Sequence, residues 1–393
     1  MVVDRLVQVR IRGYRAVIDA AFDPAIDRTV VVGGNGSGKS SVLDAIGLVG
    51  DLVRHGPGAF RGHLRGNLYD PTDRFDVNRS AFGAGQIEVE LGFRLGQNDF
   101  GYQVAIGPVD DGWRIVGEML VGPTHPLIHR DRTGVRVRRV DATDAIPLVP
   151  VYVDPQLPAV TLGADPISHP DLAAPLRFLR GLCVVQPTPV AMRAAAAPFD
   201  RPARESPLDP LPHRYGEDAT TRLIRLANDR PGQRASFLRL MGEFVGWTEF
   251  RTPRASRVEF YEGTPDPLAF EAASDGTVVE AWLLALALDP PTQLSVLLLD
   301  EPSAQFFRKS LQRPAELLKT LATQRQLIVA THAAPLVSEL ADSTRVWVAT
   351  RSPGAGTLLR RLSAIHGSDE AVIELGLGEG ALLEAREMPE DGT

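Results

Sequence analysis

The sequence contains one cysteine, three lysines and no apolar run long enough to span a membrane. The single cysteine, Cys183, excludes an intramolecular disulfide framework and favours a reducing, cytoplasmic location. The most apolar stretch covers 281–288 and stops at Asp289 and Pro290. Because a membrane span needs roughly 20 apolar residues, no association with a membrane is expected.

The chain also lacks the composition of disordered, collagen-like or coiled-coil proteins. It is 44% hydrophobic and 23% charged, which is ordinary for a globular protein. The formal net charge is -7, so the whole chain is not a polycation that coats nucleic acid, and only local basic patches remain for that role. A length of 393 residues leaves room for two or three domains.

Local patterns predict β-structure in the first part of the chain. Residues 6–11 alternate apolar and polar and predict a half-buried strand, with 17–22 as its hairpin partner. A β-branched run predicts a strand over 29–32, and apolar residues at helical spacing predict a helix over 41–53. From 86 to 153 the period is near two, with glycines between the runs, which predicts an antiparallel meander.

The second part of the chain predicts helices and buried strands. Dense proline predicts a loop or linker over 155–175. The clearest helices are 220–227 and 235–245, and a further helix is expected from Ser274 to Leu288. Prolines between Pro198 and Pro231 exclude a long helical hairpin, so no coiled-coil arms are expected.

A glycine-rich stretch, Gly33 to Ser40, matches the phosphate-binding pattern G-x-x-x-x-G-K-S and lies between the predicted strand and helix. Its backbone N–H groups and the start of the helix can surround phosphate oxygens. Lys39 can bridge the β- and γ-phosphates, and the Ser40 hydroxyl can bind Mg²⁺. Lys39 is informative because the chain otherwise almost always uses arginine. The alternative is a glycine-rich turn without a ligand.

Two apolar strands end in polar residues that suit the same chemistry. The run 296–299 ends in Asp300 and Glu301, which could hold Mg²⁺ and polarise a water molecule; the alternative is two solvated carboxylates. The run 327–330 leads to His332, whose imidazole can donate to a γ-phosphate oxygen; the alternative is a capped turn.

The tetrad Ser274-Asp275-Gly276-Thr277 precedes an apolar helix and has two readings. It is either a helix cap or an anion site formed by Ser274, the Gly276 amide and the helix N-terminus. A second phosphate site is useful when it serves the nucleotide of another subunit.

In this order the motifs resemble the ATP-binding-cassette (ABC) ATPase superfamily. The similarity is to its soluble, non-transporter branch, with RecF-like and SMC-like heads and the OLD-like AAA-family ATPases. The resemblance implies that Gly33 to Ser41 is Walker A, Asp300-Glu301 is Walker B and His332 is the switch histidine. It implies nucleotide contacts from the following residues: Gly33, Asn35, Gly36, Ser37, Gly38, Lys39, Ser40, Ser41, Gln186, Arg15, Ser274 and Gly276.

Further roles follow from the same resemblance. Ser274 and Gly276 would form the signature motif, and Gln186 would be the Q-loop glutamine and a Mg²⁺ ligand beside Ser40 and Asp300. Arg15, like Arg12, would lie in a turn near the nucleotide; solvated surface arginines are the alternative. Lys39, Glu301 and His332 would be catalytic, with ATP and Mg²⁺ as cofactors.

The implied fold is α/β, an ABC-ATPase head with a mixed P-loop sheet core, an antiparallel β-subdomain and an inserted helical lobe. The expected divisions are a core of 1–65 and 265–365, a β-subdomain of 66–155, a linker and helical lobe of 156–264, and an acidic tail of 366–393. One departure is the run 302–307, which lacks the usual glycine-leucine-histidine-proline sequence and puts the dimer contact in doubt.

Two groups of basic residues could meet a phosphate backbone or form a solvated surface. One comprises Arg54, His55, Arg61, His63 and Arg65; the other comprises Arg136, Arg138 and Arg139.

The sequence therefore predicts an ATPase that works as an ATP-gated head-to-tail homodimer around two nucleotides. It would regulate or drive a partner effector, with anti-phage defence as one setting. The alternative is a DNA repair or maintenance ATPase that binds DNA directly. A transporter ATPase subunit and a nucleotide-binding protein without turnover fit the sequence less well.

Overall fold

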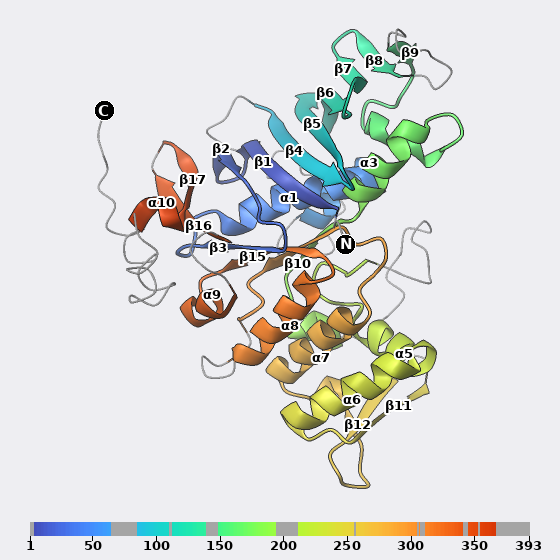
Figure 1. Cartoon of the computed structure of the whole chain (residues 1–393), viewed down its shortest axis with the longest axis vertical. Coiled ribbons are helices and arrows are strands. Elements are labelled where there is room, and N and C mark those ends of the chain that lie inside the picture. Colours follow the sequence, from blue (N-terminus) through green and yellow to red (C-terminus); the bar gives the residue numbers. More distant parts are fainter. Residues whose placement is uncertain are drawn as a thin grey trace.

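The computed structural model describes residues 4–63, 85–109, 112–138, 148–193, 211–254, 257–304, 306, 311–340, 345–352 and 354–366. Two large sheets and a helical lobe make up this part of the chain (Figure 1). All but the first residue of the predicted tail, 366–393, lies outside the described residues.

The first sheet is antiparallel, with the strand order β2-β1-β4-β5-β6-β7-β8-β9. Its strands are β1 (Arg5–Tyr14), β2 (Val17–Phe22), β4 (Ile87–Leu95), β5 (Asn98–Val109), β6 (Gly112–Val121), β7 (Pro126–Asp131), β8 (Gly134–Val137) and β9 (Val149–Val151). From β4 onward each strand pairs with the next along the chain, which confirms the meander. β1 pairs with β4 as well as β2, so the N-terminal hairpin extends this sheet. The division of the chain at residue 65 stays a prediction.

The second sheet is mixed, with the order β10-β14-β15-β3-β16-β17. Its strands are β10 (Leu182–Val185), β14 (Val296–Asp300), β15 (Gln326–Thr331), β3 (Arg28–Val32), β16 (Val346–Ser352) and β17 (Gly356–Arg361). The first five run parallel, and β17 is antiparallel to β16. Because parallel strands end at one edge, the segments that follow β3, β10, β14 and β15 meet there.

Helix α1 (Lys39–His55) lies between the two sheets (Figure 1) and contacts strands of both. Twelve of its 17 residues are buried, since it faces apolar side chains on two sides. Gly47 and Gly50 allow the close approach to the mixed sheet, because a Cβ there would lie 2.2 Å from Val184 Cγ2 and 2.4 Å from the Leu182 carbonyl oxygen. The 3₁₀ helix η1 (Gly56–His63) follows α1.

The mixed sheet separates two hydrophobic cores. Leu298 and Ile328 pack into the core that contains α1, whereas Leu297 and Leu299 pack into the core of the helical lobe. Successive side chains of a strand point to opposite faces, so strands that are apolar throughout are buried on both sides. This explains why 296–299 and 327–330 read as continuous apolar runs.

The helical lobe covers the other face of the mixed sheet (Figure 1). Its helices are α4 (Pro189–Arg193), α5 (Ala219–Asp229), α6 (Pro231–Val245), α7 (Asp275–Leu288), α8 (Gln312–Ala322) and α9 (Ala334–Leu340), and α10 (Leu362–His366) follows β17. A small antiparallel sheet of β11 (Glu249–Arg254), β12 (Arg257–Tyr261) and β13 (Leu268–Ala269), followed by η3 (Phe270–Ala272), completes the lobe. Sequence patterns did not predict this sheet.

The loop predicted for 155–175 is wrong in part. It contains the 3₁₀ helix η2 (Ala159–Ala164) and the start of α3 (Pro170–Arg180). Pro170 opens α3, where a proline loses no hydrogen bond and its fixed φ suits the helix. Leu172, Leu176 and Leu179 bury one face of α3 in the core with α1, which stabilises the helix despite Pro175. None of the helices in the described ranges is both long and apolar enough to cross a membrane.

Candidate nucleotide site

The glycine-rich loop joins β3 to α1, as the sequence predicted. Gly36 and Gly38 have positive φ angles of 81° and 97°, a region that side chains strongly disfavour. Gly38 caps α1 in the left-handed conformation, and its carbonyl accepts from the Val42 N–H at 3.0 Å. The Ser37 N–H donates to the Gly34 carbonyl at 3.3 Å. The loop therefore curls at the end of the strand and leads directly into the helix.

Lys39 is buried inside this curl. Its Nζ donates to the carbonyl oxygens of Gly33 at 2.8 Å and Gly34 at 3.1 Å, and it lies 3.7 Å from Glu301 Oε1. The Ser37 hydroxyl is also buried, and it has no hydrogen-bond partner in the part of the chain that the structure describes. A buried hydroxyl without a partner is costly, so the loop has a donor ready for a ligand oxygen.

Ser40 and Asp300 lie together although they are 260 residues apart in the chain. The Ser40 hydroxyl donates to Asp300 Oδ1 at 2.8 Å. Asp300 ends β14 and is only 1% exposed. A hydroxyl and a carboxylate are both oxygen ligands of the kind that Mg²⁺ prefers. The described residues contain no group of three or more His, Cys, Asp or Glu side chains that could hold a metal ion.

Glu301 and His332 are in close contact at the same edge. His332 Nδ1 lies 2.8 Å from Glu301 Oε2, and the His332 N–H donates to the same oxygen at 3.3 Å. Glu301 has a positive φ of 51°, which is strained for a residue with a side chain. Its N–H donates to the Ala330 carbonyl at 2.8 Å, so the strained turn is held against the end of β15. This turn aims the carboxylate toward His332 and Lys39.

Gln186 lies one residue beyond β10, beside β14. Val185 pairs with Leu299, which places Gln186 at the strand edge that carries Asp300. The backbone N–H of Gln186 donates to the Arg214 carbonyl at 2.6 Å, and Gln186 is partly buried. The structure thus brings the predicted Q-loop residue to the same edge as Asp300 and Glu301, the predicted Walker B carboxylates.

Arg15 does not stand alone in its turn. It has a positive φ of 47°, and its Nη1 pairs with Asp44 Oδ2 on α1. Arg214 Nη2 pairs with the other oxygen of Asp44, which is 1% exposed. Burial lowers the pKa of Arg214, but Asp44 raises it by more, so the guanidinium stays charged. One buried carboxylate therefore joins the Arg15 turn, the P-loop helix and the segment that holds Gln186.

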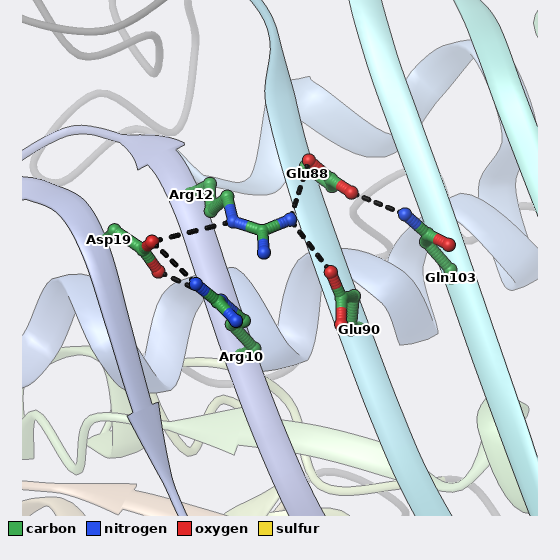
Figure 2. A network of polar contacts seen from close by, with 6 residues as sticks. All are labelled: Arg10, Arg12, Asp19, Glu88, Glu90 and Gln103. Atoms are coloured by element: carbon green, nitrogen blue, oxygen red, sulfur yellow. Dashed lines mark hydrogen bonds and ion pairs between the residues drawn. The ribbon is translucent and has the colours of Figure 1, made fainter.

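Sequence reasoning missed Asp44 and Arg214. The available signal was an acidic residue in the apolar helix 41–53, one turn after Ser40. Arg12 lies on β1 and does not join this group. Its side chain belongs to an ion-pair network on the surface of the antiparallel sheet (Figure 2). It lies 3.1 Å from Glu88, 2.8 Å from Glu90 and 3.5 Å from Asp19.

Ser274 and Gly276 belong to the helical lobe. Ser274 caps α7: its Oγ accepts from the Thr277 N–H at 3.3 Å and lies 2.8 Å from Thr277 Oγ1. Ser274 and Asp275 are exposed. This geometry agrees with the helix-cap reading, and the exposure of Ser274 and Asp275 leaves the turn accessible to another molecule.

The two basic groups differ in their surroundings. Arg54 donates to the Arg180 and Leu182 carbonyls and pairs with Asp51, which makes it part of the packing around α1. Arg136 is exposed on β8. The side chains of Arg61, His63, Arg65 and Arg139 lie outside the described residues.

Residues 28–120 match the family model described as "AAA domain, putative AbiEii toxin, Type IV TA system". This range holds β3, the P-loop, α1 and the first strands of the meander. Over 92% of this chain and 99% of the other, the structure is similar to an SMC head bound to the C-winged helix domain of ScpA, with a TM-score of 0.55 and 14% identity. The chain has the fold of an SMC-type ATPase head.

A second solved structure shares this head fold. It is the Smc head domain with an extended coiled coil, bound to the C-terminal domain of ScpA derived from Pyrococcus furiosus. The TM-score is 0.50 and the identity 13%, over 94% of this chain and 99% of that one. No curated protein sequence matches this chain significantly. The predicted resemblance to SMC-like heads is confirmed at the level of the fold, an α/β head with a mixed sheet and an antiparallel sheet.

Proposed function

We propose that this ATPase head binds ATP with Mg²⁺ and hydrolyses it. The observation that carries the proposal is the convergence of Lys39, Ser40, Asp300, Glu301 and His332 at one edge of the mixed sheet. These side chains come from three distant segments of the chain. Together they supply a cation that can bind phosphate, oxygen ligands that can bind a metal ion, and a carboxylate that can orient water.

The P-loop fits a chain of phosphates. The left-handed glycines turn the backbone inward, and the Ser37 hydroxyl has no hydrogen-bond partner within the described ranges. Lys39 can exchange its bonds to the Gly33 and Gly34 carbonyls for phosphate oxygens. Contacts from Asn35 and Ser41 follow from the same loop and belong to the proposal.

The Ser40–Asp300 pair fits Mg²⁺. When bound there, the ion would neutralise charge that develops on the phosphates. Ser40 would supply its hydroxyl oxygen and Asp300 its carboxylate, with Gln186 beside them. Mg²⁺ keeps several waters and uses few protein ligands, so a hydroxyl and one or two side chains suffice.

Glu301 would act on the attacking water. Its carboxylate can accept a hydrogen bond from water and orient a lone pair for attack. The His332 imidazole, held at 2.8 Å from Glu301, keeps that carboxylate in place and can donate to a phosphate oxygen after it turns. Lys39, 3.7 Å from the same carboxylate, offsets its negative charge.

Ser274 and Gly276 are the residues through which a second copy of this chain would contribute to the site. The exposed turn of α7 belongs to the lobe, whereas the P-loop lies at the strand edge. We therefore propose a head-to-tail homodimer in which each turn would meet the nucleotide of the other copy. Closing with ATP and opening after hydrolysis would be the mechanical output.

The output would regulate a partner effector in the cytoplasm, with anti-phage defence as the setting. The matched family model, whose description includes a toxin of a toxin–antitoxin system, supports this assignment. The alternative is a DNA repair or maintenance ATPase that binds DNA directly. The SMC-type head fold favours that alternative, because the similar heads come from SMC proteins.

The test is ATP hydrolysis by the purified protein beside Glu301→Gln, with the molar mass measured with and without ATP–Mg²⁺. We expect Glu301→Gln to lower kcat by about 10²–10⁴-fold and to dimerise with ATP. Glu316→Gln, at an exposed glutamate on α8, is the matched control and should keep full activity. Activity that survives Glu301→Gln would contradict the assigned role.

The same assay separates the two outputs. Hydrolysis stimulated by duplex DNA, in a salt-dependent way, would favour the DNA-binding alternative. Unchanged hydrolysis with DNA, together with a stable complex with a protein encoded beside it, would favour the effector.

A further inference from the structure

The signature turn carries an unfavourable charge. Asp275 lies between Ser274 and Gly276, the two residues proposed to meet a phosphate. Its carboxylate side chain is 56% exposed. A carboxylate close to a triphosphate repels the negatively charged phosphates. This repulsion opposes the attraction that the N-terminus of α7 exerts on them.

Arg193 on the neighbouring helix α4 neutralises this carboxylate. Its Nη2 lies 2.6 Å from Asp275 Oδ1 and donates to the Ala273 carbonyl at 2.7 Å. One nitrogen thus holds both the residue before Ser274 and the residue after it. The Arg193 side chain is 22% exposed, so the pair is only partly screened by water.

The base of Arg193 is fixed. Met192 is fully buried and packs against Gly216, where an added Cβ would lie 2.3 Å from Met192 Cε. Thr188 donates its N–H to the Tyr215 carbonyl at 3.2 Å just before α4. Since the backbone of α4 is held in this way, Arg193 loses less conformational freedom when it pairs with Asp275.

We propose that Arg193 is a positioning residue for the signature turn, which draws the Asp275 carboxylate aside so that the turn can meet the nucleotide of a second copy. This inference rests on the proposed ATP-gated dimer. Arg193 is needed in this proposal because Asp275 carries a charge. Removing that charge should therefore make Arg193 dispensable. A purely structural role for Arg193 would not be relieved by that change.

The experiment measures ATP-dependent dimerisation in the Glu301→Gln background by analytical ultracentrifugation. We expect Arg193→Ala to weaken dimerisation at least tenfold, while binding of a fluorescent ATP analogue to the monomer stays within twofold. Adding Asp275→Asn to Arg193→Ala should restore dimerisation to within threefold of the parent. The matched control is Arg239→Ala, which breaks an exposed pair with Glu243 in the same lobe and should change nothing.

Each remaining outcome decides a different point. If the double variant dimerises as weakly as Arg193→Ala, or if Arg193→Ala dimerises normally, the inference is wrong. A folding defect from the loss of Arg193 would affect the single and double variants alike, so rescue distinguishes the two causes. If Glu301→Gln itself does not dimerise with ATP, the proposed dimer fails and this inference fails with it.

Discussion

Replacing Asp44 with asparagine should strongly destabilise the fold, because this carboxylate joins three segments. Asp44 is 1% exposed on α1 and pairs with Arg15 and Arg214, whose side chains are 17% and 14% exposed. The substitution keeps the size of the side chain and removes only the charge. Two largely buried guanidinium groups then lose the carboxylate that they share.

The magnitude follows from burial. Removing one partner of a buried ion pair costs about 3–5 kcal/mol, because the remaining charge stays desolvated. That is a large part of the roughly 5–15 kcal/mol by which a domain is stable. With an unfolding entropy of about 2.1 cal/mol/K per residue over 393 residues, each kcal/mol shifts the thermal midpoint by roughly 1.2 °C, so the midpoint should fall by about 4–6 °C when the chain unfolds as one unit. Differential scanning calorimetry measures this shift directly.

Asp19 provides the matched control within the same protein. It also pairs with two arginines, Arg10 at 2.8 Å and Arg12 at 3.5 Å, but on the exposed face of the antiparallel sheet (Figure 2). The Asp19 side chain is 43% exposed, so Asp19→Asn should cost less than about 1 kcal/mol, and less again at high salt. Equal losses for Asp19→Asn and Asp44→Asn would refute the argument from burial.

Two further predictions concern buried groups. Burial raises the pKa of Glu280 while Arg313 lowers it by less, and Glu280 Oε1 has no hydrogen-bond partner among the described residues. The folded state therefore favours the protonated acid, and stability falls as pH rises from its ordinary pKa through the raised one; Glu280→Gln should match the wild type at acidic pH and be more stable than the wild type at neutral pH. The same gain at every pH in calorimetry would contradict this. In the P-loop, Gly38→Ala should cost about 1–3 kcal/mol, because its Cβ would lie 1.9 Å from Thr357 Oγ1 at a φ of 97°, whereas Gly34→Ala has open space and should cost little. Similar thermal midpoints for the two variants would disprove this steric account.

Most of the candidate site could be predicted from the sequence because its motifs are local. The P-loop needs only neighbouring glycines, one lysine and one hydroxyl, and flanking patterns announce a strand and a helix. The strands before Asp300 and His332 are apolar on both faces, so their edge position followed from parallel-sheet geometry. The structure brings Lys39, Ser40, Asp300, Glu301 and His332 together as these patterns indicated.

Other parts of the fold could not be predicted from local patterns. The prolines of α3 argued against a helix when only the sequence was considered. In the structure, the packing of its leucines stabilises the helix despite these prolines. The small sheet of β11, β12 and β13 has short strands whose pairing depends on aromatic contacts in the lobe, such as Trp247 stacked on Phe260 with centroids 3.6 Å apart. The pairing of β1 with β4 joins segments that β2, β3 and α1 separate along the chain.

The sequence by itself determined which residues are the candidates for binding phosphate and metal, and the order of most of the strands and helices that carry them. Only the tertiary structure decided which charged side chains pair. Asp44 pairs with both Arg15 and Arg214, the latter 170 residues away, and Arg193 pairs with Asp275. Motifs are local because a loop or helix turn needs only neighbouring residues. Ion pairs between distant segments depend on how the sheets and the lobe pack, and that packing is set by the whole chain.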